Sequence, residues 1–279
     1  MKITIISNFG KGNAEASLPY MVDFFIGSGC SVNSYMYNYE GNYPKEAFAQ
    51  CDIVLAVGGD GTIIHTAKIC AQHEKPILGI NAGTLGYTAG MEYGEMDLLC
   101  KLLDGNYIAE RRLMIEAQLV SPQGEKQFLA LNEFVISGEV SKIIDYEMAV
   151  DHHRVYGYRA DGFILATPTG STAYALSAGG PVIEPSIACM EYMPICPHSF
   201  MNRSIIFADQ TTIHVRIPER NINQVYLSAD GENREVLHHG AEICFQKAAF
   251  PATFIRFSDK SFYDILNKKM VSVNRDPVT

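Results

Sequence analysis

The chain has 279 residues, of which 47% are hydrophobic and 19% charged, and its formal net charge is −9 at pH 7. These proportions are typical of a globular protein, and the acidic balance argues against nucleic acid as the main partner. No apolar run approaches the ~20 residues of a membrane helix, and residues 1–10 lack the apolar region of a signal peptide. We therefore expect a cytoplasmic protein that binds neither membrane nor nucleic acid.

Seven cysteines are scattered along the chain, and none forms a CxxC pair. Such spacing indicates reduced thiols rather than a disulfide framework or a zinc site. We expect no tightly bound metal.

The first hundred residues alternate strand-like and helix-like segments. Runs at 3–6, 53–57 and 77–80 predict strands, and the uninterrupted apolar run at 53–57 is typical of a sheet that is buried on both faces. An apolar stripe such as that at 63–71 predicts a helix between two of them. This alternation predicts an α/β domain with a parallel, doubly wound sheet, which we place in residues 1–110.

The pattern changes in residues 111–258. Residues 114–120 alternate apolar and polar side chains, and further strand-like runs follow, among them 128–137 and 253–257. Short strands joined by polar turns predict a mostly antiparallel β domain. The tail, 259–279, places apolar residues on one helical face, and we expect this helix to complete the first domain.

A glycine-rich turn, Gly58-Gly59-Asp60-Gly61-Thr62, follows the run at 53–57 and opens the next helix. Ligands of open α/β sheets bind at the carboxyl ends of strands, where glycines let backbone N–H groups approach a phosphate. The Asp60 carboxylate could accept a proton from a hydroxyl nucleophile or help hold Mg²⁺. Alternatively, the segment is a tight turn in which Asp60 caps the helix.

A second polar segment, 161–181, runs from a carboxylate through an apolar strand into a hydroxyl-rich turn. A protein core does not require so many hydroxyls, but a hydrogen-bonding surface can use them because each one both donates and accepts. With the glycine-rich turn, this segment predicts a nucleotide site. The six hydroxyl side chains of segment 161–181 belong to Thr167, Thr169, Ser171, Thr172, Tyr174 and Ser177.

Two polar pairs remain open to two interpretations. Asn132 and Glu133 interrupt an apolar run, and they either grip ribose hydroxyls and a base edge or mark an exposed strand end. Arg159 and Asp161 flank a strand start, and they either form a surface ion pair or bind a phosphate and a carboxamide.

The two segments together resemble the ATP-dependent NAD kinase family. That family carries a GGDGT loop, present here at 58–62, and a DG…TPTGSTAY segment, present at 161–174, with an Asn-Glu pair between them at Asn132 and Glu133. The resemblance extends from about residue 50 to the C-terminus. GGDGT alone also has relatives in lipid kinases and phosphofructokinases, whereas TPTGSTAY is highly specific. The chain has neither a GxxxxGK[ST] loop nor a GxGxxG motif, which disfavours P-loop kinases and Rossmann dehydrogenases.

The resemblance implies an NAD kinase, which transfers the γ-phosphoryl group of ATP to the 2′-hydroxyl of the adenosine ribose of NAD and makes NADP. It also implies Mg²⁺ or another divalent cation with ATP, and a homotetramer formed through the β domains. The alternatives are another GGDGT-type kinase, acting on a lipid or sugar phosphate, and a non-catalytic dinucleotide sensor.

By the same resemblance, Asp60 is the catalytic residue. The residues for which it implies contact with substrate or nucleotide are Gly59, Asp60, Gly61, Asn132, Glu133, Lys142, Arg159, Asp161, Thr172, Ala173, Tyr174, Ala175, Leu176, Ser177 and Glu232.

Overall fold

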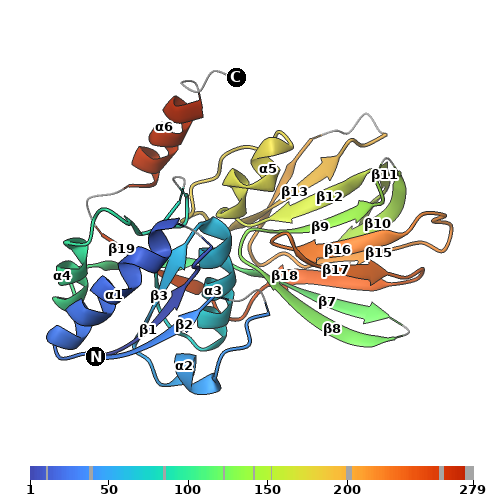
Figure 1. Ribbon diagram of the computed structural model, residues 1–279. Helices are drawn as coiled ribbons and strands as arrows, with labels where there is room; N and C mark the ends of the chain where they lie inside the picture. The colour runs from blue at the N-terminus through green and yellow to red at the C-terminus, as the bar shows by residue number, and fades with distance from the viewer. Residues whose placement is uncertain are drawn as a thin grey trace. The chain divides into compact units, whose positions relative to one another are not determined.

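The chain divides into two compact units in the computed structural model (Figure 1). Unit 1 comprises Met1–Arg112 and Ala252–Thr279, and unit 2 comprises Leu113–Pro251. The structure describes residues 1–10, 12–37, 40–83, 86–121, 123–140, 142–151, 153–198, 203–257 and 261–273.

Unit 1 is built on a seven-stranded sheet with the order β2-β1-β3-β4-β19-β6, in which β5 also pairs with β4. All pairings are parallel except that of β19 with β6. The predicted α/β domain is therefore confirmed, with one antiparallel edge strand. The strands are β1 Lys2–Ser7, β2 Ser31–Met36, β3 Ile53–Gly58, β4 Ile77–Asn81, β5 Met91–Glu92, β6 Ile108–Arg112 and β19 Ala252–Arg256.

Helices cover both faces of this sheet. Apolar residues of α1 (Gly12–Gly27) and α4 (Leu98–Leu103) share one core cluster with Leu78 and Ile80 of β4. Gly79 lies between these two residues and faces the other way, and a Cβ atom there would lie 2.9 Å from Ile63 of α3 (Asp60–Gln72). The sheet is thus doubly wound. A short helix, α2 (Lys45–Ala49), precedes β3.

The assignment of the run at 253–257 to the β domain is wrong. The strand β19 pairs with β4 and β6 inside the sheet of unit 1. The C-terminal helix α6 (Phe262–Val273) also groups with unit 1, but its Phe262 and Leu266 are only half-buried and Tyr263 is 60% exposed. No helix in the described ranges is long and apolar enough to cross a membrane.

Unit 2 consists of two six-stranded antiparallel sheets, with the orders β11-β10-β15-β18-β7-β8 and β14-β13-β12-β9-β16-β17. The predicted antiparallel β domain is confirmed. Its elements are β7 Ile115–Ser121, β8 Gly124–Ala130, β9 Glu133–Gly138, β10 Ile144–Val150, β11 His153–Ala160, β12 Gly162–Ala166, the 3₁₀ turn η1 Gly170–Thr172, α5 Tyr174–Ser177, β13 Cys189–Ile195, β14 Ile205–Ala208, β15 Ile213–Arg216, β16 Val225–Ala229, β17 Glu232–Leu237 and β18 Glu242–Lys247.

Inward side chains of both sheets form a single core cluster in unit 2. Aromatic rings dominate it: Phe134 and Phe163 contact Phe245 from the opposite sheet. The hydroxyls of Tyr146 and Tyr192, also from opposite sheets, lie 2.7 Å apart and satisfy each other. The two sheets therefore pack face to face as a sandwich.

The predicted strand at 128–137 is two strands. Its first part, β8, pairs with β7, and its second part, β9, pairs with β12 and β16 in the other sheet. Leu131 and Asn132 lie between them, at the point where the chain passes from one sheet to the other.

Candidate active site

The glycine-rich turn of unit 1 connects the buried strand β3 to α3. A Cβ atom on Gly58 would lie 2.7 Å from Thr62 Oγ1, so the turn excludes a side chain there. Gly61 is different, because nothing lies within 4 Å of the position of its absent Cβ. Packing within the fold therefore does not require glycine at position 61. A ligand that approaches the backbone closely would require glycine there, because it has no side chain.

Asp60 does not cap the helix that it begins. The N-cap residue is Gly59, which makes no side-chain capping bond. The Asp60 carboxylate instead accepts hydrogen bonds from the Tyr87 N–H at 3.2 Å, the Thr88 N–H at 3.2 Å and the Thr88 hydroxyl at 2.5 Å. The capping alternative is therefore wrong: Asp60 faces the loop that follows β4.

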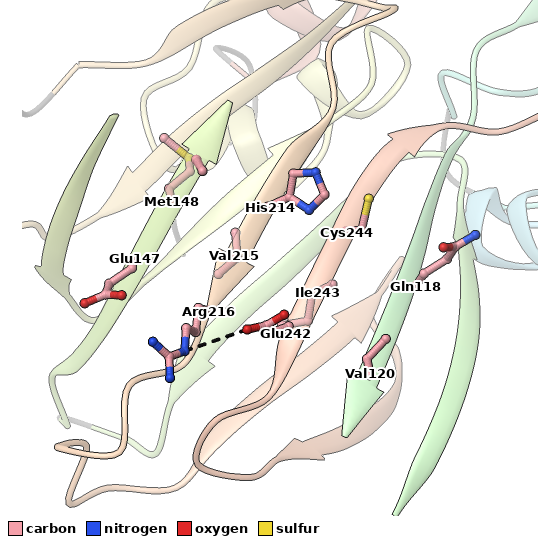
Figure 2. Close-up of a pocket in the computed structure, with 11 residues that line it drawn as sticks. Gln118, Val120, Glu147, Met148, His214, Val215, Arg216, Glu242, Ile243 and Cys244 are labelled. Atoms are coloured by element: carbon pink, nitrogen blue, oxygen red, sulfur yellow. Dashed lines mark ion pairs between the residues drawn. The ribbon is translucent and has the colours of Figure 1, made fainter. Parts of the chain in front are cut away.

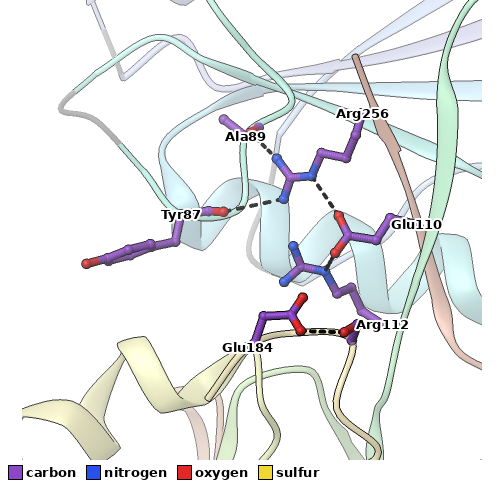
Figure 3. A network of polar contacts seen from close by, with 7 residues as sticks. Tyr87, Ala89, Glu110, Arg112, Glu184 and Arg256 are labelled. Carbon is purple, nitrogen blue, oxygen red and sulfur yellow. Dashed lines mark hydrogen bonds and ion pairs between the residues drawn. The ribbon is translucent and has the colours of Figure 1, made fainter. Parts of the chain in front are cut away.

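A buried ionic network holds the far side of that loop (Figure 3). The Arg256 guanidinium donates to the carbonyls of Tyr87 and Ala89, and also to Glu110. The neighbouring guanidinium groups of Arg112 and Arg256 outweigh burial and hold the pKa of Glu110 below its usual range. Burial lowers the pKa of Arg256 to about 10, so this side chain stays charged at neutral pH. The loop is thus fixed between Arg256 and Asp60.

The loop at 81–86 begins at the end of β4, as the glycine-rich turn begins at the end of β3. Asn81 is buried and donates to Glu92 at 2.7 Å, while its side-chain oxygen accepts the Gly83 N–H. Thr84 and Leu85 lie outside the described residues.

Several hydroxyls of the second polar segment serve the fold. Thr167 donates to the carbonyl of Leu131 at 2.5 Å, and Thr172 donates to that of Thr169 at 3.2 Å. The fully buried Ser171 hydroxyl donates to Pro168 and accepts the Ile183 N–H. These residues shape the turn after β12, so the interpretation of all six hydroxyls as a binding surface is too broad.

Three of the four side chains of α5 are exposed. Tyr174 is 46% exposed, and Leu176 and Ser177 are also exposed, while Thr172 and Ala173 are half-buried. Their neighbour Ala175 is fully buried against Ile164, Ala166 and Met193. Only the backbone of Ala175 is therefore available for binding, and its carbonyl already accepts the Gly180 N–H.

Asn132 and Glu133 are buried, which excludes the exposed-strand-end alternative. Asn132 Oδ1 and Glu133 Oε2 form no hydrogen bond with any described residue. Burial, with a smaller contribution from the Asp230 charge, raises the pKa of Glu133 to about 8, although a hydrogen bond from the Tyr174 backbone opposes the rise. Buried polar atoms without partners cost free energy, so this pair is suited to a ligand that supplies donors.

The other predicted binding residues of unit 2 are more exposed. Arg159 on β11 and Lys142 are exposed, and Asp161 and Glu232 are half-buried. No ion pair joins Arg159 to Asp161, both of which the structure describes, so the ion-pair interpretation is unsupported. Among the described residues, no group of three His, Cys, Asp or Glu side chains could hold a metal ion.

Sequence reasoning missed three polar residues, one in unit 1 and two in unit 2. Thr88 donates to Asp60, and Asp230 accepts the backbone N–H groups of Leu131, Asn132 and Glu133. Asp230-Gly231 is a turn dipeptide, which signals a hairpin but not this contact. The third residue, Glu191 on β13, had no signal because it stands in an apolar run.

Glu191 is fully buried, and its two carboxylate oxygens form no hydrogen bond with any described residue. Burial raises the pKa of this carboxyl from 4.5 to about 7. The folded state therefore holds the proton more tightly than the unfolded state. The resulting stability is complete below pH ~4.5 and is lost as the pH rises toward 7.

The Glu191→Gln variant has no ionisable group at this position. We therefore expect its stability relative to that of the parent to increase as the pH rises. The free energy of unfolding of the variant relative to the parent should increase by about 1 kcal/mol or more between pH 5 and pH 8. Urea denaturation at the two pH values measures this difference, and Glu125→Gln at an exposed position of β8 is the control. An equal pH dependence in parent and Glu191→Gln would contradict the prediction.

A cavity of about 480 Å³ lies over β7, β10, β15 and β18 in unit 2 (Figure 2). Its walls include Val120, Met148, Val215 and Cys244, with the exposed ion pair of Arg216 and Glu242 at 3.8 Å across its rim. None of the predicted site residues lines it. The cavity is mainly apolar, whereas the residues predicted to bind substrate or nucleotide are mainly polar.

Family models match both units. The ATP-NAD kinase N-terminal domain matches residues 13–107, and the ATP-NAD kinase C-terminal domain matches residues 131–257. An NAD kinase of Carboxydothermus hydrogenoformans is 39% identical to the chain, over 82% of this chain and 83% of that protein. An NAD kinase of Symbiobacterium thermophilum is 40% identical, over 80% of each.

Solved structures agree with this sequence similarity. An NAD kinase from Archaeoglobus fulgidus in complex with ATP has a TM-score of 0.78 and 29% identity, and the match covers 98% of this chain and 99% of that one. Yeast NADH kinase complexed with NADH has a TM-score of 0.84 at 21% identity, covering 100% of this chain and 89% of that one, which shows the shared fold.

The fold and the carboxylate at the glycine turn define a phosphotransferase with an α/β unit and an antiparallel β unit. The chain belongs to the ATP-NAD kinase family, and its activity is that of an NAD kinase.

Proposed function

We propose that the protein transfers the γ-phosphoryl group of ATP to the 2′-hydroxyl of the adenosine ribose of NAD, with Asp60 as the catalytic carboxylate. Asp60 orients that hydroxyl and accepts its proton as the phosphoryl group arrives. The open backbone at Gly61 and the N-terminus of α3 support a phosphate beside it.

The observation that carries the dinucleotide assignment is the buried pair of Asn132 and Glu133. Asn132 Oδ1 and Glu133 Oε2 lack a partner among the described residues, and an adenosine offers ribose hydroxyls and an amino group as donors. Tyr174, Ser177 and Asp161 then add exposed or half-buried contacts for the rest of NAD.

The divalent cation enters with ATP in this proposal. Mg²⁺ keeps most of its waters and binds through phosphates plus one or two carboxylates. Asp60 is a single carboxylate at the turn, which fits a cation brought by the phosphates rather than a resident metal. Mg²⁺ held by Asp60 and the phosphates would supply positive charge against the charge that develops on the transferring group.

One assay separates this function from its alternatives. Protein incubated with NAD, ATP and Mg²⁺ should yield NADP, identified by a NADP-specific dehydrogenase. Binding of NAD without NADP formation would support the non-catalytic sensor. ATP consumption with a lipid or sugar phosphate, but not with NAD, would support another GGDGT-type kinase.

Tyr174→Ala should weaken NAD binding roughly tenfold and leave the fold intact, because an exposed aromatic ring on α5 offers stacking area to a base. Isothermal titration calorimetry measures the affinity. Tyr20→Ala is a matched control, since Tyr20 on α1 is 54% exposed and lies outside the proposed site. An unchanged affinity in Tyr174→Ala would remove this ring from the site.

We also propose that the protein assembles as a homotetramer through unit 2. The mainly apolar cavity over β7, β10, β15 and β18 supports this, since interfaces bury such surfaces around a polar rim. Light scattering at micromolar concentration should give a mass near four times the 30.8 kDa of one chain. A fully active 30.8 kDa species would contradict the assembly.

A further inference from the structure

The segment Leu131–Glu133 connects the two sheets of unit 2 and contains the buried polar pair Asn132 and Glu133. β8 ends at Ala130 and β9 begins at Glu133, so Leu131 and Asn132 belong to neither ladder. All three residues are buried. The backbone N–H and C=O groups of Leu131 and Asn132 therefore need partners from elsewhere, because unpaired buried backbone groups are costly.

Asp230 supplies the acceptors. Its Oδ2 accepts the Leu131 N–H at 3.0 Å, and its Oδ1 accepts the N–H groups of Asn132 at 2.7 Å and Glu133 at 3.1 Å. The Asp230 N–H in turn donates to the Glu133 carbonyl at 2.9 Å. Three consecutive N–H groups thus converge on one carboxylate in charge-assisted hydrogen bonds.

Thr167 supplies the donors. Its hydroxyl donates to the Leu131 carbonyl at 2.5 Å, and its backbone N–H donates to the Asn132 carbonyl at 2.8 Å. The same hydroxyl accepts the Gly170 N–H at 3.1 Å. The hydroxyl-rich turn and the Asp230 turn therefore hold the same short segment.

A simple turn role does not account for the Asp230 contacts. Ala229 pairs with Glu232, and Asp230 and Gly231 have φ values of 51° and 72°, as in a two-residue hairpin turn with both central residues left-handed. Asn-Gly and Gly-Gly form such turns as readily as Asp-Gly. The turn by itself needs no carboxylate. The N–H groups of Leu131–Glu133, which lie nearly a hundred residues away in sequence, do need an acceptor, and the Asp230 carboxylate provides it.

We propose that Asp230 is a positioning residue: together with Thr167, it holds the backbone of Leu131–Glu133 so that the Asn132 and Glu133 side chains face the dinucleotide in one orientation. This inference rests on the proposed role of that pair in binding NAD. Asp230 acts through the backbone and needs no contact with the substrate.

The test uses two substitutions that preserve the turn. Asp230→Asn keeps the shape but presents an N–H donor where Leu131 N–H needs an acceptor, and Asp230→Gly removes the carboxylate altogether. Asp151→Asn is the control, because Asp151 also has positive φ (46°) and its carboxylate accepts the backbone N–H of Thr212.

Two measurements are made on the full-length variants. Hydrogen exchange followed by mass spectrometry should show roughly tenfold faster exchange or more at Leu131–Glu133 in both Asp230 variants, with β16 and β17 unchanged. Calorimetry should show NAD affinity reduced about tenfold or more, and steady-state kinetics should show a raised KM for NAD with the KM for ATP unchanged. Asp151→Asn should match the parent throughout.

Unchanged exchange at Leu131–Glu133 in both Asp230 variants would overturn the positioning role. So would faster exchange with parental NAD affinity, provided that Asn132→Ala does weaken NAD binding. Parental affinity in Asn132→Ala itself would instead overturn the proposed role of the pair, and the two failures are thereby told apart.

Discussion

Asp60→Asn is expected to lower kcat by about 100-fold or more while NAD affinity stays near that of the parent. A ribose hydroxyl is a weak nucleophile at neutral pH, and an amide of the same shape cannot accept its proton as a carboxylate does. Because phosphoryl transfer depends on positioning, the same change also misplaces the hydroxyl or the Mg²⁺ that accompanies ATP. Steady-state kinetics and calorimetry on the folded variant measure the two quantities.

The Asp60 contacts with the loop after β4 require a second variant. Asp60→Asn disturbs the hydrogen bonds from Tyr87 and Thr88 as well as the chemistry. Thr88→Val removes one of these bonds and leaves the carboxylate in place, so it should cost far less in kcat. An equal loss in both variants would assign Asp60 to loop structure. A kcat within about threefold of the parent in Asp60→Asn would reject the catalytic role.

Gly170→Ala is expected to destabilise unit 2 by roughly 3 kcal/mol and to weaken NAD binding. A Cβ atom at this position would lie 2.1 Å from the Asn132 carbonyl oxygen, 2.5 Å from its carbon and 2.8 Å from Asn132 Cα. All three atoms are backbone, so no side chain can move aside. The segment that carries Asn132 and Glu133 must shift instead.

Urea denaturation and calorimetry measure the two effects of Gly170→Ala. Gly157→Ala on β11 is the matched control, because nothing lies within 4 Å of the position of its absent Cβ. A loss of stability below about 0.5 kcal/mol in Gly170→Ala would mean that the turn accommodates a methyl group without cost.

Local sequence patterns predicted much of the structure of this protein. Unbroken apolar runs such as 53–57 predicted strands buried on both faces, and β3 is such a strand. The glycines of GGDGT predicted a strand-to-helix turn, and Gly58 does exclude a side chain there. The family itself was recognisable from 58–62 and 161–174, because chemistry there depends on residues that are adjacent in the chain.

Tertiary structure alone decided which polar side chains face inward and what holds them. Thr167 and Ser171 turned out to be structural, while Tyr174 on the next turn is exposed. Periodicity could not reveal this, since burial there depends on which strand lies opposite.

The same limit explains the errors at 128–137 and 253–257. An apolar run looks the same whether it stays in one sheet or crosses to another, and whether its strand partners belong to unit 1 or to unit 2. The deciding contacts join distant residues: Asp230 with Leu131–Glu133, and Arg256 with the loop that binds Asp60. Sequence therefore determined the fold class and the chemistry, whereas long-range hydrogen bonds, which no local pattern encodes, decided how the site is held.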